Sequence, residues 1–180
     1  MQRTRLDTVP CPVARSLERV GEWWSILILR DAMQGLTRFD EFQKSLGIAP
    51  NILTRRLSKL VESGLLERRQ YSDRPERFEY VLTERGEDFR PVLWTLVAWG
   101  NKHFAPEGPS MVIVDTTTGV WADPILVDSN SGKQMLTPEF RPAAGPAARP
   151  GQSRHALVSR RSGARLEPAA SQKSARKSLE

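Results

Sequence analysis

The sequence has few of the residues that commonly build disulfides, metal sites and catalytic centres. It contains one cysteine, Cys11, and two histidines, His103 and His155, in 180 residues. A single cysteine excludes an internal disulfide and a thiolate-rich metal site. No nucleophile elbow, phosphate-binding loop or carboxylate–histidine metal spacing is present. We therefore expect no enzyme activity, no metal and no cofactor.

Long apolar runs are also missing. No stretch approaches the roughly 20 residues that span a bilayer, and the N-terminal MQRTRLDTVPCPVARS has no apolar core of a signal peptide. We expect a cytoplasmic protein without a membrane partner. The hydrophobic content of 39% is nevertheless sufficient for the core of one domain.

Positive charge predominates but is unevenly distributed. Residues 1–104 hold 17 Lys/Arg against 14 Asp/Glu, residues 105–140 hold 1 against 5, and residues 141–180 hold 9 against 2. A mildly basic body with a strongly basic end suits a polyanion such as nucleic acid. From 142 to 180 the chain is rich in Ala, Pro, Ser, Gly and Arg without periodicity, which predicts a disordered basic tail.

Four helices are expected in the first part of the chain. Apolar spacing with Pro and Gly at the ends places them at 12–20, 23–33, 38–46 and from Pro50 or Asn51 to just before Gly64. The second, WWSILILRDAM, is apolar except on the side of Arg30 and Asp31 and should be the most buried. Thr37 is the expected N-cap of the third helix. Only GIAP joins the last two helices, which predicts a helix-turn-helix pair.

The last of these helices has one apolar face and one polar face. Leu53, Leu57, Leu60 and Val61 share the apolar face. The other side presents Asn51, Thr54, Arg55, Ser58 and Lys59. A polar face is by itself more often simply solvated, so the residues that follow decide its interpretation.

A charged β-hairpin is predicted next. LLERRQY (65–71) and RFEYVL (77–82) have strand composition and are separated by the turn-rich SDRPE. A helix-turn-helix pair followed by such a hairpin is a winged-helix arrangement, in which the second helix enters the DNA major groove and the hairpin lies over the backbone. The hairpin carries Arg68, Arg69, Arg74 and Arg77. The alternative is that Asp73, Glu76 and Glu79 partly neutralise them. The expected fold class is mainly α with a small β-hairpin (α+β).

Residues 83–104 are predicted to form a long C-terminal helix with an extensive apolar stripe. The stripe comprises Phe89, Val92, Leu93, Leu96, Val97, Gly100 and Phe104. It exceeds what a small winged helix needs, which favours a dimer interface shared with the N-terminal helix, although a place in the core of the same domain remains the alternative. Pro91 should kink the helix or mark where its second half begins.

Residues 105–141 form a separate extension. It contains two similar units, VIVDTTTG (112–119) and ILVDSNSG (125–132), each a β-branched run followed by a turn that ends in Gly. Such units predict a small β-hairpin or meander appended to the preceding helix. Their spacing is similar to the paired turns of a zinc ribbon, but the thiolate positions hold Val114, Thr117, Val127 and Asn130, so no metal is expected. Effector binding, dimer contact and stabilisation all remain open as roles.

Residues 9–104 resemble a known family. The segments CPVARSLERVGEWWSILILRD and RFDEFQKSLGIAPNILTRRLSKLVESGLLERRQYSDRPERFEYVLTERGEDFRPVL, with the closing WG, are similar to the HxlR family of bacterial winged-helix regulators, which are relatives of the MarR regulators. The resemblance implies a homodimer that binds an inverted-repeat operator and typically represses nearby genes. It also implies that a cysteine at the position of Cys11 senses oxidants or electrophiles in many relatives.

The polar side chains of the second helix of the pair are assigned either to DNA bases or to phosphates. Arg55 can hydrogen-bond guanine and Asn51 can pair with adenine, while Thr54 and Ser58 lie in the same two turns. Arg56 and Lys59 are assigned to phosphates. Arg56 is also a candidate for a salt bridge between packed helices.

Two further questions remain open at this level. Cys11 lies between two prolines at a helix N-terminus, a turn from Arg15, which would favour its thiolate; the alternative is a small buried apolar residue. The alternative function is a winged-helix protein–protein interaction module, which predicts weak and salt-insensitive DNA binding. A small-molecule effector would act most directly at the interface of the N-terminal and last helices.

Overall fold

The structure is a computed structural model that describes Leu6 and residues 11–135, 139–143 and 145–146. The chain divides into two units, residues 1–135 and 136–180. Most of the expected basic tail lies outside the described residues. Within the described part of the chain, no helix is both long and apolar enough to cross a membrane.

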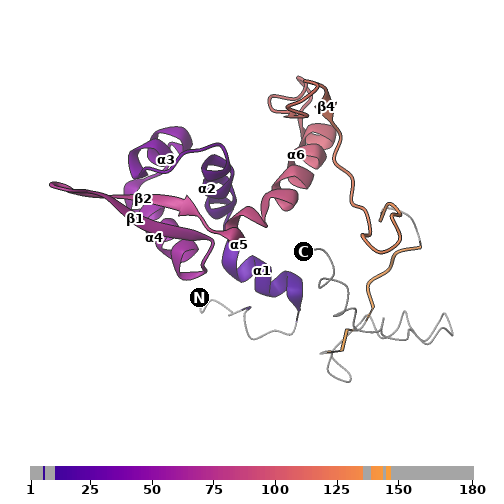
Figure 1. Ribbon diagram of the computed structural model, residues 1–180, viewed down its shortest axis with the longest axis horizontal. Helices are drawn as coiled ribbons and strands as arrows, with labels where there is room; N and C mark the ends of the chain where they lie inside the picture. The colour runs from indigo at the N-terminus through magenta and orange to yellow at the C-terminus, as the bar shows by residue number, and fades with distance from the viewer. Residues whose placement is uncertain (1–5, 7–10, 136–138, 144, 147–180) are drawn as a thin grey trace, which may run out of the picture. The chain divides into compact units, whose positions relative to one another are not determined.

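The first unit contains helices and two small antiparallel sheets (Figure 1). The elements follow in the order α1 (Pro12–Val20), α2 (Trp23–Met33), α3 (Phe39–Leu46), α4 (Pro50–Glu62), β1 (Leu66–Asp73), β2 (Glu76–Leu82), α5 (Glu84–Glu87), α6 (Arg90–Phe104), β3 (Ile113–Val114) and β4 (Trp121–Ala122). The predicted mainly α fold with one wing-like hairpin is confirmed.

The core is built around α2, as its composition predicted. Ile28 and Leu29 are completely buried and pack with the buried faces of α3 and α4. Two details differ from expectation. Asp31 is only 2% exposed, and its Oδ1 accepts a 2.8 Å hydrogen bond from Nε of Arg30. Trp23 is 72% exposed because it lies in the first turn of α2.

The helix-turn-helix pair has the predicted bounds, with one difference at its start. The N-cap of α3 is Arg38 instead of Thr37. Glu41 Oε2 accepts hydrogen bonds from the backbone N–H groups of both residues, at 2.9 and 3.0 Å, so a carboxylate in the first turn performs the capping. Gly47 ends α3 in the left-handed region at φ 60°, which a glycine adopts without strain.

The hairpin β1–β2 follows α4 and extends past α3 and α4 in Figure 1. Leu66 pairs with Leu82 at its base and Asp73 with Glu76 near its tip, and the register shifts between Gln70 and Ser72. A short bridge from Arg38 to Glu79 ties the chain before α3 to the outer edge of β2. The hairpin is therefore anchored at its base and along β2.

The prediction of one continuous helix over 83–104 is wrong in detail, because two helices, α5 and α6, occupy this range. Thr83 caps α5 by accepting a 3.1 Å hydrogen bond from the N–H of Gly86, and α6 begins at Arg90. Pro91 stands in the first turn of α6, where its missing N–H breaks no hydrogen bond. This is the restart that Pro91 predicted.

The extension contains two separate tight turns, one for each predicted unit. In the first, Asp115 accepts from the N–H of Thr117 at 2.8 Å and β3 pairs with β4. In the second, Asp128 accepts from the N–H of Ser131 at 3.0 Å, and a bridge joins Val127 to Gln134. The extension also contacts the body, because the side-chain amide of Asn101 in α6 donates to the carbonyl of Met111 at 2.9 Å.

Candidate nucleic-acid interface

α4 is fixed to the domain by one face and open on the other. Leu53, Leu57 and Leu60 are completely buried, as predicted. The opposite side exposes Asn51, Thr54, Arg55 and Ser58. A helix anchored in this way presents its polar face at a fixed angle, with little freedom to rotate.

Two of these polar side chains already make local hydrogen bonds. Asn51 Oδ1 accepts from the N–H of Ile52 at 2.9 Å, and Thr54 Oγ1 donates to the carbonyl of Pro50 at 2.9 Å. Both bonds hold the side chains near the start of the helix without using all their hydrogen-bonding capacity. Within the described residues, Arg55 and Ser58 form no such bond, so they are the most available groups on this face.

Arg56, next to Arg55 in the sequence, points toward the interior of the domain. Its side chain is 11% exposed, and Nη2 lies 2.9 Å from Glu22 Oε2, just before α2. The structure thus shows the helix-packing salt bridge that was the alternative for Arg56, and its burial counts against a phosphate contact. A shift of one position from Arg55 rotates the side chain by about 100°, into the interior.

Lys59 is only partly available. Its Nζ is 4.0 Å from Glu18 Oε1 of α1, and its side chain is 39% exposed. An interaction at that distance is weak in water. Lys59 can therefore exchange this partner for another anion.

The four wing arginines differ in their surroundings. Arg69 pairs with Glu67 at 2.9 Å, and this contact lowers the pKa of Glu67 and raises that of Arg69. The guanidinium of Arg68 lies 3.4 Å from the centre of the Phe78 ring. Arg74 and Arg77 are exposed at the tip, and within the described residues neither has an ion pair. The ion-pair partner in the wing is thus Glu67, and among the described residues Asp73, Glu76 and Glu79, the carboxylates of the alternative, form no ion pair with these arginines.

Arg38 is a basic residue of this surface that the sequence did not single out. It is exposed at the start of α3, and its guanidinium lies 4.9 Å from the centre of the Tyr71 ring in the wing. The contact depends on the bridge between the chain before α3 and β2. Nothing in the local sequence around Arg38 indicates this proximity.

The residues expected at a dimer interface separate into two groups. Leu93 is 7% exposed and belongs to the core, and Phe89 is half-buried against it, so for Leu93 the alternative of a place within the domain is correct. Leu96 and Phe104 are 40% and 66% exposed, whereas Val97 and Gly100 are intermediate. Val92 of the predicted stripe is also exposed, and two further exposed apolar residues of α6, Trp94 and Trp99, were missing from it.

Cys11 occupies the N-cap position of α1 and is partly exposed. Its carbonyl accepts a 3.0 Å hydrogen bond from the N–H of Arg15, the first bond of the helix. Its side chain caps nothing. The thiol is thus placed at a helix N-terminus as expected, and its reactivity stays a prediction.

Comparison with known proteins gives a consistent result. The family model for HxlR-like helix-turn-helix proteins matches residues 19–108. An uncharacterized HTH-type transcriptional regulator of Mycobacterium tuberculosis, Rv3095, is 42% identical over 135 residues, which is 74% of this chain and 85% of that protein. This alignment is longer than the region that the family model matches, so it takes in most of the segment between residue 108 and residue 135.

Two solved structures are also similar. PA1374 of Pseudomonas aeruginosa is 57% identical with a TM-score of 0.57, over 78% of this chain and 96% of that chain. PA1607 is 37% identical with a TM-score of 0.70, over 79% of this chain and all of that chain. Both carry a provisional assignment as transcription factors.

Proposed function

This chain belongs to the HxlR-like helix-turn-helix family of transcriptional regulators, and on that basis we propose that it is a homodimeric repressor that binds a pseudo-palindromic operator in double-stranded DNA. The observation that carries the proposal is the division of α4 into a fully buried face and a polar face with exposed Asn51, Thr54, Arg55 and Ser58. A repressor acts where the chromosome is, so we place it in the cytoplasm.

The first two turns of α4 enter the major groove. Arg55 donates to guanine O6 and N7 through its two-pronged guanidinium, and Asn51 pairs with adenine. Each such contact contributes about 1–3 kcal/mol of discrimination against a wrong base. Thr54 and Ser58 lie in the same turns and contact base edges or nearby phosphates.

The wing contacts the DNA backbone. Arg74 and Arg77 at its tip bind phosphates, and Arg68 and Arg69 follow along the hairpin. Lys59 of α4 and Arg38 before α3 add positive charge for further phosphate contacts. Phosphate contacts carry no sequence information of their own, so this set fixes position and contributes affinity that depends on salt.

The dimer forms through α1 and α6. Val13 and Leu17 of α1 and Leu96, Trp99 and Phe104 of α6 are all at least 40% exposed, and exposed apolar side chains gathered on neighbouring elements commonly mark a protein–protein interface. A two-fold axis through this face would place the two copies of α4 about one DNA turn apart, roughly 34–36 Å. That spacing is the reason for a pseudo-palindromic operator.

We assign effector binding to a cavity beside the same interface. A largely apolar cavity of about 380 Å³ lies between α2, α6 and residues 111–113, and Ile26, Trp94 and Val97 are among its lining residues. Its two arginines, Arg30 and Arg90, are already paired with carboxylates. The cavity therefore favours an uncharged apolar or aromatic molecule, which would change the spacing of the recognition helices by moving α6.

Cys11 offers a second route to regulation, by an oxidant or an electrophile. Its place directly before α1 would transmit a modification to the proposed dimer face. Operator affinity is expected to fall after treatment with peroxide, a quinone or an aldehyde in the wild type and to remain constant in Cys11→Ser. An equal fall in both proteins would rule out Cys11 as the trigger.

The competing proposal is a protein–protein interaction module. It is less favoured because Arg74 and Arg77 at the wing tip are exposed and are not neutralised by carboxylates among the described residues. A module for a protein partner would bind DNA weakly and with little dependence on salt.

The deciding experiment measures affinity for DNA directly upstream of the protein's own gene and for unrelated DNA, at two salt concentrations. Wild type is compared with Arg55→Ala and with Arg55→Lys, which keeps the charge but loses the two-pronged donor. We expect a specificity ratio of about a thousand or more that collapses in both variants. Equal, weak binding of both DNAs by all three proteins would contradict the proposal.

A further inference from the structure

Residues 123–127, here called the return segment, run back beside α6 after β4. Leu126 of this segment lines an apolar cavity of about 410 Å³ together with five residues of α6, namely Pro91, Val92, Thr95, Leu96 and Trp99. None of the described residues that line it is charged. Leu126 is 46% exposed and Trp99 is 55% exposed, so the return segment lies beside α6 without closing on it.

The cavity is continuous with the apolar surface of α1. Val92 and Leu96 also line a second cavity of about 610 Å³, whose other wall includes Val13 and Leu17 of α1. A single apolar surface thus runs from α1 across α6 to the return segment. Leaving such a surface in water is unfavourable, and patches of this kind usually mark an interaction site.

We propose that the return segment packs against α6 of a second copy of this chain. Side chains of that second copy fill the cavity that lies, within the first copy, between the return segment and α6. This inference rests on the proposed dimer and adds to it a surface outside residues 19–108. Each copy contributes the same segment to the other, as a two-fold symmetric contact requires.

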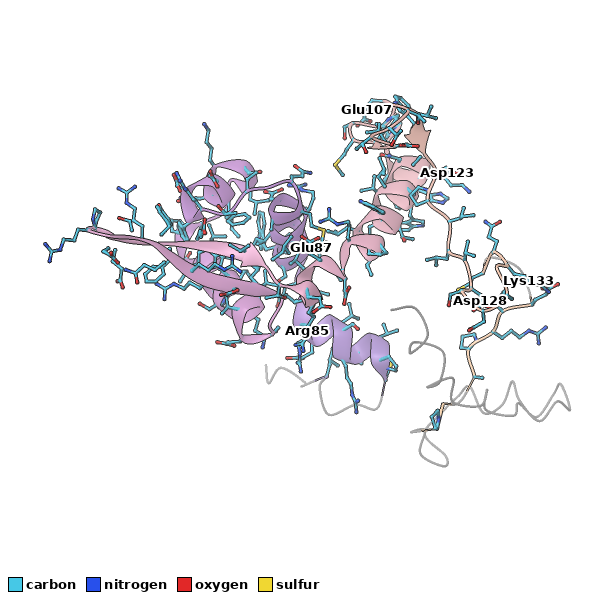
Figure 2. All side chains as sticks on the ribbon, in the orientation of Figure 1. Arg85, Glu87, Glu107, Asp123, Asp128 and Lys133 are labelled. Atoms are coloured by element: carbon cyan, nitrogen blue, oxygen red, sulfur yellow. The ribbon has the colours of Figure 1, made fainter. Side chains whose placement is uncertain are left out.

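The geometry of α6 supports this occupant. A two-fold axis across α6 pairs the helices antiparallel, and 15 residues span about 22 Å, so the C-terminal end of one helix lies beside the N-terminal end of the other. Figure 2 shows Arg85 near the α5 end of α6 and Asp123 near the opposite end. In the dimer, Asp123 of one copy therefore approaches the region of Arg85 in its partner.

Charge complementarity points to the same arrangement. Arg19 and Arg85 stand among the residues lining the cavity between α1 and α6, and both are exposed. The segment 105–140 has the opposite balance, with 1 Lys/Arg against 5 Asp/Glu. Asp88 lines the same cavity, so its described lining carries two guanidiniums against one carboxylate. An apolar segment bordered by carboxylates fits an apolar groove with this positive balance, and it would repel a nucleic acid.

The similar proteins add independent support. The alignment with Rv3095 and the structural match to PA1607, which covers that whole chain, both extend past the family region. A segment that accompanies the regulatory domain in this way is more simply explained by a role in the regulator itself than by a chance appendage.

The test is Leu126→Asp in the full chain, with Val114→Asp as the matched control because the two side chains are 46% and 45% exposed. Sedimentation velocity over a range of concentrations gives the dimer dissociation constant. We expect at least a tenfold increase for Leu126→Asp and less than a twofold change for the control. Circular dichroism of both variants confirms that they fold.

A second measurement needs no substitution. Hydrogen exchange of the wild-type chain, above and below its dimer dissociation constant, should show protection of residues 123–127 that is lost on dilution. Protection that is the same at both concentrations, or a folded Leu126→Asp that dimerises like the wild type, overturns the inference. A wild type that remains monomeric at every concentration overturns the proposed dimer as well, so the two failures are distinguishable.

Discussion

The neighbouring residues Arg55 and Arg56 of α4 should act differently, Arg55 in DNA binding and Arg56 in the stability of the fold. Arg55 points to solvent, whereas Arg56 is buried against Glu22 with an N–O distance of 2.9 Å. We expect Arg56→Ala to reduce the free energy of unfolding and Arg55→Ala to leave it nearly unchanged. In samples that remain folded, Arg55→Ala should weaken specific DNA binding and Arg56→Ala should leave it nearly unchanged.

The size of the effect follows from burial. Removing one partner costs about 3–5 kcal/mol for a fully buried pair and about 0–1 kcal/mol for an exposed pair. Here the side chain of Arg56 is 11% exposed and that of Glu22 is 37% exposed, so an intermediate loss of about 2 kcal/mol is expected from the same comparison. An exposed substitution such as Arg55→Ala usually stays within about 0.5 kcal/mol.

Urea unfolding measures the difference. With a slope of about 1–3 kcal/mol per molar urea, Arg56→Ala should lower the midpoint by about 1 M. A double-mutant cycle with Glu22→Ala should give a coupling of about 0.5–3 kcal/mol. The reasoning is refuted if Arg56→Ala unfolds at the wild-type midpoint but loses specific DNA binding, because Arg56 would then act on DNA.

Three other predictions concern the wing, the capping carboxylate and a close backbone approach. The double variant Arg74→Ala/Arg77→Ala should weaken binding to specific and unrelated DNA alike and reduce the slope of log affinity against log salt by about 2, since each lost phosphate contact contributes about 0.9; a loss confined to operator DNA would contradict this. Backbone hydrogen bonds to Glu41 lower its pKa below the ordinary value of about 4.5, so its contribution to stability is fully present above that ordinary value and is lost as the pH falls through the lowered one. Glu41→Gln should therefore lower the urea midpoint at pH 7, and this deficit should shrink as the pH falls through the lowered pKa; a deficit that stays constant throughout acid titration would refute the charge argument. A Cβ on Gly86 would lie 2.2 Å from a backbone oxygen of the turn after α4, whereas one on Gly100 would meet nothing within 4 Å. Thermal unfolding should thus show a loss of at least about 1–3 kcal/mol for Gly86→Ala and no loss for Gly100→Ala, with equal melting temperatures counting against the close approach.

Much of the fold could be worked out from residue spacing because the relevant signals are local. The apolar positions of α4 recur at helical intervals, Gly47 and Pro50 mark the turn between α3 and α4, and the strand composition before and after SDRPE specifies a hairpin. Each of these features depends on backbone geometry over a few residues. They were sufficient to predict the winged-helix architecture and the polar face of its second helix.

Whether an individual side chain is buried, and which residue it contacts, depended on contacts between segments that are distant in the sequence. Spacing gives the direction of Arg56 and Leu93 around their helices, but it does not say which neighbour covers that direction. Glu22 meets Arg56 from 34 residues away, and α2 covers Leu93, while Leu96 one turn later remains open. Burial results from how the helices pack against one another, and a period within one helix carries no information about the element beside it.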